Sequence, residues 1–196
     1  MNGSFDVLIV GVGGQGTILA SNVLGEACLI ENKPVRAAET HGMAQRGGSV
    51  ESHVRVGCEF GPLISPGTAD LILAFDMLEA LRASHFLKEG GLIIASLQLI
   101  VPVSVYMKKL DPPTIQSIRN ALMGKDAIFI DAEECAVRAG SPLTTNMVII
   151  GAASPLIPLS LSSLKKAVAK RVPAKTLEIN DRAFEIGREE YLKAKS

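Results

Sequence analysis

A run of glycines near the start of the chain lies between an apolar segment and a second segment of helical character. Gly11-Val12-Gly13-Gly14-Gln15-Gly16 directly follows residues 5–10, which are rich in Val, Leu and Ile. Residues 17–30 carry no charge before Glu26, so most of the surface of a helix formed there should be buried. A buried strand, a glycine turn and a helix in this order are typical of the first unit of an α/β fold.

The rest of the chain alternates between strand-like and helix-like segments. The predicted strands are residues 34–39, 50–56, 69–75, 92–96 and 127–130. The predicted helices are residues 77–87, 114–123, 131–139, 147–153, 160–172 and a last helix capped by Asn180 or Asp181, while residues 57–67 and 101–113 are expected to be irregular. This alternation predicts an α/β fold with a Rossmann-like, mostly parallel sheet and flanking helices. We expect residues 1–196 to form a single domain, on which C-terminal helices from about residue 146 to 196 pack.

Two local patterns add detail to this prediction. Residues 50–56 alternate between apolar or small side chains and polar ones, which predicts one buried face and one solvated face that carries His53 and Arg55. Asp76 is placed to cap the helix over residues 77–87, and Gly90-Gly91 is expected to end it.

The charge balance limits the partners of the chain. Lys and Arg together number 20, as do Asp and Glu, so the formal net charge is zero. A broad nucleic-acid surface needs a basic excess that neutralises phosphates, so we expect no nucleic-acid partner. A neutral protein lacks strong self-repulsion, which is compatible with a homodimer of the isolated chain.

The cysteines and the apolar runs indicate the compartment and exclude several kinds of site. Cys28, Cys58 and Cys135 are widely spaced and form no C-x-x-C pair, so they are interpreted as small core residues rather than ligands of zinc or of an iron–sulfur cluster. No apolar run reaches the roughly 18 residues of a spanning helix, and the N-terminus has no signal-peptide pattern. We therefore expect a cytoplasmic protein with no membrane partner.

The glycine motif predicts a place for an anion. Gly11-x-Gly13-x-x-Gly16 would present backbone N–H groups at a helix N-terminus to a phosphate or carboxylate. Glu39 ends the second predicted strand, where a dinucleotide-binding protein keeps an acid for the ribose, so an NAD(P)-binding dehydrogenase domain is one alternative. Gly14 and Gln15 are not required by dinucleotide geometry, and 196 residues leave little room for a separate catalytic domain.

A second motif, Glu39–Ser49, is called the polar corner below. It combines His41, Gln45 and Arg46 with the pair Gly47-Gly48 between two predicted strands. His41 has the pKa range of a general base, and the guanidinium of Arg46 can bind a carboxylate or phosphate. No catalytic partner stands at a recognisable spacing, so a hydrogen-bonded corner and a ligand or partner site are both open on these residues alone.

The two motifs together resemble the gamma domain of the 2-oxoacid:ferredoxin oxidoreductases. Residues 11–16 are similar to the glycine motif of that family, and Glu39–Val50, continuing into His53–Gly57, resembles the beta subunits of the indolepyruvate:ferredoxin oxidoreductases in particular. Relatives that act on pyruvate or 2-oxoglutarate carry different residues before the Arg-Gly pair, so His41–Gln45 distinguishes them. The resemblance continues through residues 65–70, 146–152 and 180–187, and covers nearly the whole chain.

The resemblance implies the small subunit of an enzyme. The family oxidatively decarboxylates aryl 2-oxoacids such as indolepyruvate to the acyl-CoA, with CoA as co-substrate, and passes electrons to ferredoxin. Thiamine diphosphate, Mg and the iron–sulfur clusters belong to the larger alpha subunit, so this chain alone should bind no cofactor and be inactive. A non-catalytic scaffold subunit is the other alternative. The candidate contacts to a ligand or to the alpha subunit are Gly11, Gly13, Gly14, Gln15, Gly16, His41, Gln45, Arg46, Gly47 and Gly48.

Overall fold

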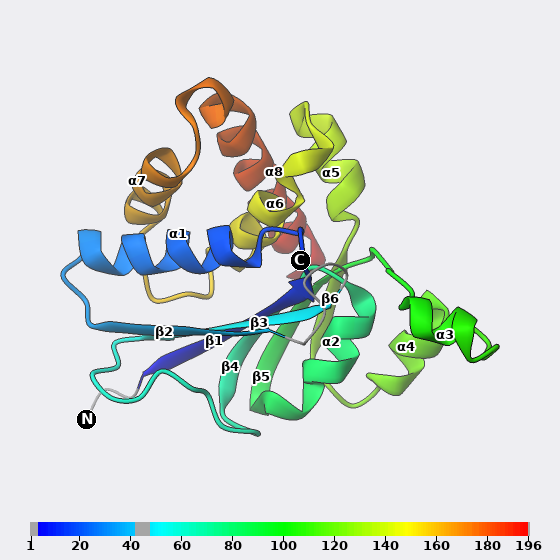
Figure 1. The fold of residues 1–196 in the computed structure, drawn as a ribbon. Helices are drawn as coiled ribbons and strands as arrows, with labels where there is room; N and C mark the ends of the chain where they lie inside the picture. Colours follow the sequence, from blue (N-terminus) through cyan, green and yellow to red (C-terminus); the bar gives the residue numbers. More distant parts are fainter. Residues whose placement is uncertain (1–3, 42–47, 196) are drawn as a thin grey trace.

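A computed structural model describes residues 4–41 and 48–195, and its strands form one mixed sheet (Figure 1). The strand order is β2-β3-β1-β4-β5-β6, in which β1 is parallel to β4, β4 to β5 and β5 to β6. β3 lies between β1 and β2 and is antiparallel to both. The strands are β1 (Phe5–Val12), β2 (Val35–His41), β3 (Ser49–Val56), β4 (Ala69–Ala74), β5 (Leu87–Ser96) and β6 (Ala127–Ile130). The prediction of a mostly parallel α/β sheet is confirmed.

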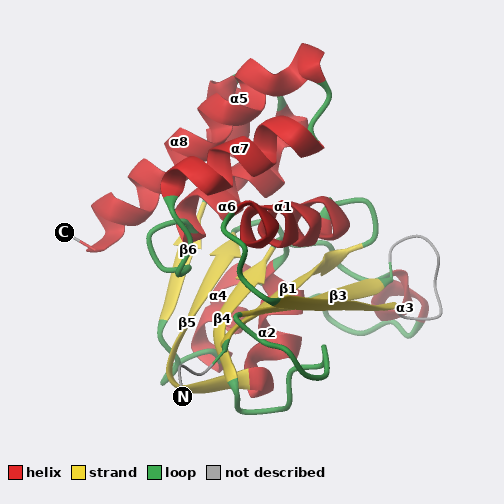
Figure 2. Ribbon diagram, turned by 90° about the vertical axis from the view of Figure 1, so that its left-hand side faces the viewer, coloured by secondary structure: helices red, strands yellow, loops and turns green. Residues whose placement is uncertain are grey.

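Helices cover both faces of this sheet (Figure 2). The helices are α1 (Thr17–Ile30), α2 (Met77–Ala83), α3 (Val103–Met107), α4 (Ile115–Ala121), α5 (Ala132–Ala139), α6 (Thr145–Ala153), α7 (Leu161–Arg171) and α8 (Leu177–Lys195), with short 3-10 helices at Ser84–Phe86, Pro142–Thr144 and Ala174–Thr176. Alternate residues of β1 divide the core: Val7 and Ile9 pack with α1, α5, α6, α7 and α8, whereas Leu8 and Val10 pack with α2 and α4. The helical C-terminal part is therefore joined to the sheet by a shared apolar core.

Two glycines allow α6 and α8 to cross in close contact. A Cβ built on Gly151 would lie 1.9 Å from the carbonyl oxygen of Phe184, and one built on Gly187 would lie 1.9 Å from that of Val148. No larger residue fits at either position without a shift of backbone. This crossing fixes α8 against α6 and buries the side chain of Phe184 completely.

The predicted solvated face of β3 is wrong for His53. The chain that follows β3 covers this side chain: His53 is 3% exposed, and its Nδ1 accepts a hydrogen bond from the Ile64 amide at 3.2 Å. Its ring also packs edge-on against Phe86. Burial lowers the pKa of His53, and Glu51 opposes that shift only in part. Arg55 is half-buried and pairs with Asp6 at 3.0 Å.

Three boundaries also differ from the prediction, each for a local reason. Gly90-Gly91 lies within β5 instead of ending a helix, and Gly91 fits there because a Cβ would lie 3.0 Å from the Ala69 carbonyl oxygen at an irregularity in strand pairing. The segment over residues 101–113 contains the short helix α3. Helix α8 begins at Leu177, and the Asn180 side chain donates back to the Thr176 carbonyl instead of capping.

The three cysteines are core residues, as predicted. Cys28, Cys58 and Cys135 are all buried, and burial raises the pKa of the Cys28 thiol to about 11 and also raises that of Cys135. Over residues 4–41 and 48–195, no helix is long and apolar enough to span a membrane. The same residues include no group of three or more His, Cys, Asp or Glu placed to hold a metal ion.

Candidate functional site

The carboxyl ends of β1 and β4 define the candidate site. These neighbouring parallel strands lead into α1 and α2, which lie on opposite faces of the sheet. Ligands of open α/β sheets bind at such a switch point. The N-terminus of α2 is already closed there by Asp76, whose Oδ1 accepts from the amides of Leu78 and Glu79 at 2.8 and 3.2 Å. Burial raises the pKa of Asp76 although backbone amides surround its carboxylate.

Gln15 joins the glycine turn after β1 to the residues that follow β4 and β5. Its Oε1 accepts from the Val12 amide at 2.7 Å, and its Nε2 donates to the Phe75 carbonyl at 3.1 Å and to Oε1 of Gln98 at 2.6 Å. Nε2 of Gln98 donates in turn to Glu133 at 2.8 Å. Both functional atoms of the Gln15 amide are satisfied, and its side chain bridges the ends of β1 and β4. Gln15 therefore holds the turn in shape.

Gly16 meets Asn146 at the start of α1. Gly16 has φ 85°, and a Cβ built there would lie 2.4 Å from Nδ2 of Asn146. The positive φ favours glycine, and a Cβ at this position would displace the Asn146 carboxamide. Asn146 is only 6% exposed, and its Oδ1 accepts from the Met147 amide at 2.9 Å. Within the part of the chain that the structure describes, Nδ2 of Asn146 has no acceptor.

The N-termini of α1 and α6 converge around this carboxamide. Asn146 is in the first turn of α6, and Gly16 immediately precedes α1. In the described chain, the N-cap residue of neither helix has a side chain that binds the first turn, and neither first turn contains an acidic residue, in contrast to α2. Two positive helix ends and an amide donor that has no acceptor among the described residues favour a carboxylate or phosphate at this place.

The structure brings the end of the polar corner to the glycine turn. The Gly13 amide donates to the Gly48 carbonyl at 3.0 Å, and Ser49 pairs with Val12. The hydroxyl of Ser49 donates to the buried Glu79 at 2.5 Å, and Glu79 also binds Arg82. The backbone of His41 pairs with Val50 at the end of β2. Gln45, Arg46 and Gly47 lie outside the described residues.

The position of Glu39 argues against a dinucleotide site. Glu39 is opposite Ser52 of β3, and Ser52 is opposite Ile9 of β1, so two strand spacings, roughly 10 Å, separate Glu39 from β1. In the dinucleotide-binding arrangement the acid is on the strand beside β1, close to the glycine turn. The predicted unit of two parallel strands joined by α1 is present, but β3 is inserted between them.

Sequence reasoning did not single out Gln98 or Glu133, which complete the amide chain. Gln98 carries one usable signal, since it is a polar residue just after an apolar strand and such positions gather at the carboxyl edge of a parallel sheet. Asn146 was noted only as part of a motif, and the sequence contains no sign of its contact with Gly16, 130 residues earlier.

Fold and site together define a Rossmann-like α/β protein with a glycine turn at the carboxyl edge of its sheet. The chain belongs to the pyruvate ferredoxin/flavodoxin oxidoreductase family, whose model matches residues 6–190. It is 42% identical to the indolepyruvate oxidoreductase subunit IorB of Thermococcus kodakarensis, over 93% of this chain and 94% of the relative. The predicted family resemblance is confirmed.

Two solved structures have the same fold. The gamma subunit of a keto/oxoacid ferredoxin oxidoreductase from Geobacter sulfurreducens is 28% identical with a TM-score of 0.72, and the match covers 96% of this chain and 99% of that subunit. The 2-oxoglutarate:ferredoxin oxidoreductase from Magnetococcus marinus is 22% identical with a TM-score of 0.74, which shows likeness of fold alone. That match covers 98% of this chain but only 32% of the Magnetococcus chain, so the fold recurs there as one part of a longer polypeptide.

Proposed function

We propose that this chain is the small subunit of a 2-oxoacid:ferredoxin oxidoreductase that acts on indolepyruvate and related aryl 2-oxoacids. The observation that carries the proposal is the 42% identity, over nearly the full length of both chains, to a relative named as an indolepyruvate oxidoreductase subunit. In the proposed reaction, the bond between the carboxylate and the keto carbon breaks and releases CO₂. The acyl group forms a thioester with CoA, and two electrons pass to ferredoxin.

The proposed role of this chain is to bind and orient an anionic group of CoA or of the 2-oxoacid. Support comes from the convergence of the α1 and α6 N-termini on Asn146, where a negative charge is favoured. Gly11, Gly13, Gly14 and Gly16 shape this turn, and Gln15 holds it. We propose His41, Gln45, Arg46, Gly47 and Gly48 as further contacts to the ligand or to the partner, since the Gly48 carbonyl already lies on the glycine turn.

We propose that thiamine diphosphate, Mg and the iron–sulfur clusters are held by a larger alpha subunit. The burial of the three separated cysteines supports this assignment, because Cys28 and Cys135 pack into the apolar core and Cys58 is buried apart from them. We further propose that residues 1–196 form one domain, which the core that α6 and α8 share with the sheet supports. We also propose that the complex works in the cytoplasm.

Reconstitution tests the proposal. The chain is co-expressed with the alpha subunit, the complex is purified, and CoA-dependent ferredoxin reduction is measured with indolepyruvate, phenylpyruvate, pyruvate and 2-oxoglutarate. We expect activity with the two aryl substrates only when both subunits are present. Full activity of the alpha subunit alone would instead assign this chain a scaffold role, and a preference for pyruvate or 2-oxoglutarate would reject the proposed substrate.

A thermal-shift measurement tests the dehydrogenase alternative. A ligand that binds only the folded state stabilises it by about 2.7 kcal/mol at a hundredfold excess over its Kd. We expect no shift of the isolated chain with NAD(H) or NADP(H), because Gln15 bridges the ends of β1 and β4 and Glu39 is one strand too far from β1. A saturable shift with a nicotinamide would contradict the proposed function.

A further inference from the structure

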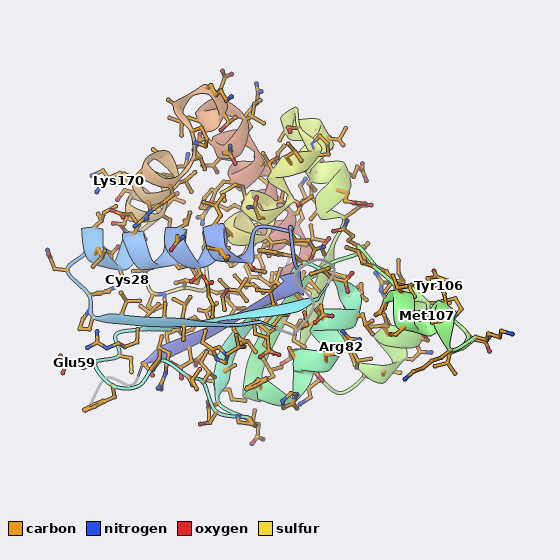
Figure 3. All side chains as sticks on the ribbon, in the orientation of Figure 1. Cys28, Glu59, Arg82, Tyr106, Met107 and Lys170 are labelled. Carbon is orange, nitrogen blue, oxygen red and sulfur yellow. The ribbon has the colours of Figure 1, made fainter. Side chains whose placement is uncertain are left out.

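Helix α3 and the residues beside it expose an apolar surface that nothing in the described chain covers. Val103, Tyr106, Met107 and Leu110, called the α3 patch below, have between 58% and 79% of their surface exposed. No residue of α3 is buried. The helix projects from the side of the molecule beyond α4, and Tyr106 and Met107 lie at this outer edge (Figures 1 and 3).

The conformation of the patch is set by local contacts. The backbone amides of Lys108 and Leu110 donate to the carbonyls of Ser104 and Val105, both at 3.0 Å. These bonds order the turn without burying any of its apolar side chains. Four large apolar side chains on one projecting turn are a costly exposure for a soluble chain, and such clusters mark interaction sites.

The segment that presents the patch is basic. Between residues 100 and 125, Lys108, Lys109, Arg119 and Lys125 stand against the single carboxylate of Asp111, a net charge of +3 in a chain whose total is zero. Lys108 and Lys109 directly adjoin the patch. A partner that fits must therefore offer an apolar hollow with carboxylates at its rim.

We propose that the α3 patch docks this chain onto the larger alpha subunit, at an apolar surface rimmed by acidic residues. This inference rests on the proposed function, which supplies the partner. Permanent interfaces are large and apolar, and Tyr and Met are enriched in them, whereas electron-transfer encounters are small and transient. The extent of apolar exposure therefore favours a permanent subunit over ferredoxin. The net charge of +3 opposes a second copy of the same surface, because two such segments repel each other.

The test removes apolar area without changing charge. The double substitution Tyr106→Ala with Met107→Ala should weaken binding to the alpha subunit at least tenfold. Calorimetry with the two subunits purified separately measures this affinity. The matched control is Val137→Ala with Leu143→Ala, which removes two apolar side chains exposed by 62% and 86% elsewhere and should leave the affinity unchanged. Neither pair supports the core, so the thermal melts of both variants should match the wild type.

A charge variant adds an independent readout. Lys108→Glu with Lys109→Glu should slow association and reverse its dependence on salt, because the new carboxylates repel the acidic rim, salt screens that repulsion, and rim charges act mainly on the rate of encounter. At saturating concentrations of the double alanine chain, ferredoxin reduction should return to the wild-type rate, since the patch contacts no substrate.

The outcomes separate the two proposals. If the wild-type chain binds the alpha subunit and the patch variant binds it equally well, the docking inference is overturned and the proposed function stands. If the wild-type chain does not bind the alpha subunit, the proposed function itself fails. If the isolated chain is a dimer by light scattering and only the patch variant is a monomer, with alpha binding intact, the patch is a self-association surface and the inference is overturned.

Discussion

Nε2 of Gln15 donates a hydrogen bond to Oε1 of Gln98 at 2.6 Å, although 83 residues separate these two side chains. The bond fastens the glycine turn after β1 to the segment that follows β5. The amide nitrogen of Gln15 faces two acceptor oxygens, those of Gln98 and of the Phe75 carbonyl. The side chain of residue 15 must therefore donate to these oxygens with one atom and accept from the Val12 amide with another. The carboxamide of glutamine does both.

Gln15→Glu should destabilise the chain by about 1–3 kcal/mol, because it replaces this donor by a charged acceptor and leaves two acceptors without a partner. Urea unfolding at pH 7.5 measures the effect. Gln116→Glu on the exposed face of α4 adds the same charge and should change the free energy of unfolding by no more than about 0.5 kcal/mol. Equal effects of the two substitutions would show that the added charge, and not the lost donor, is responsible.

Asn146→Asp should change folding and ligand binding in opposite directions. A carboxylate between the N-termini of α1 and α6 should stabilise the folded chain by about 0.3–1 kcal/mol, because it interacts favourably with both positive helix ends. The same carboxylate should repel an anionic ligand, so the KM for CoA or for the 2-oxoacid in the reconstituted complex should rise at least fivefold.

The neutral substitution Asn146→Leu isolates the amide donor. It should raise the same KM without the gain in stability, since a hydrogen bond to a charged group contributes about 1.5–3 kcal/mol. An unchanged KM in both Asn146 variants would remove the proposed anion site from this edge of the sheet.

Arg46→Ala should raise the KM for CoA or the 2-oxoacid, or weaken assembly with the alpha subunit. The planar guanidinium binds carboxylates and phosphates through two parallel hydrogen bonds, so its loss should change one of these constants about tenfold or more. Arg36→Ala is the matched control, because Arg36 is an exposed residue of β2 outside the polar corner. Wild-type kinetics and wild-type assembly of the Arg46 variant would exclude the proposed contact.

The local parts of this fold were predictable from sequence because their signals are local. The apolar residues of β1, the glycines after it and the uncharged start of α1 specify a strand, a turn and a helix without reference to the rest of the chain. The cap by Asp76 is equally local, since its carboxylate binds the amides of the next turn. These features were predicted correctly, apart from helix boundaries a few residues away.

The features that sequence reasoning missed depend on pairing between distant segments. The position of β3 between β1 and β2 is a matter of strand order in the sheet. The alternating pattern of β3 does not determine which strands lie beside it. His53 is buried because Ile64 and Phe86 fold over it, so its own position in the pattern could not reveal the cover. The contact between Gly16 and Asn146 likewise joins two helix ends that only the assembled fold brings together.

Gly187→Ala should destabilise the chain by about 1–3 kcal/mol or more, because the new methyl group would lie 1.9 Å from the Val148 carbonyl and force α8 away from α6. Gly25→Ala is the matched control: Gly25 is inside α1, and a Cβ there meets no atom within 4 Å. That control should stabilise by about 0.5–1 kcal/mol, as expected for alanine in a helix. Thermal unfolding of both variants checks the opposite signs, and a loss of stability in both would contradict the packing argument.

The stability of the chain should fall as the pH is lowered through the range in which His53 titrates. Burial holds the pKa of His53 below its ordinary value of 6.5 in the folded state, so the unfolded chain takes up the proton first as the pH falls. Between the folded-state pKa and 6.5 the unfolded state binds more protons, and stability therefore rises with pH there. The contribution of His53 is complete above 6.5 and is lost as the pH falls through the folded-state pKa, with a slope of at most about 1.4 kcal/mol per pH unit.

Urea unfolding between pH 5 and pH 8 measures this dependence. His53→Gln keeps a side-chain oxygen that can accept from the Ile64 amide and removes the titrating ring, so it should flatten the pH profile relative to the wild type. If His53→Gln retains the full slope, another group must control the loss of stability in acid, and the burial of a neutral imidazole under Ile64 and Phe86 would not be its cause.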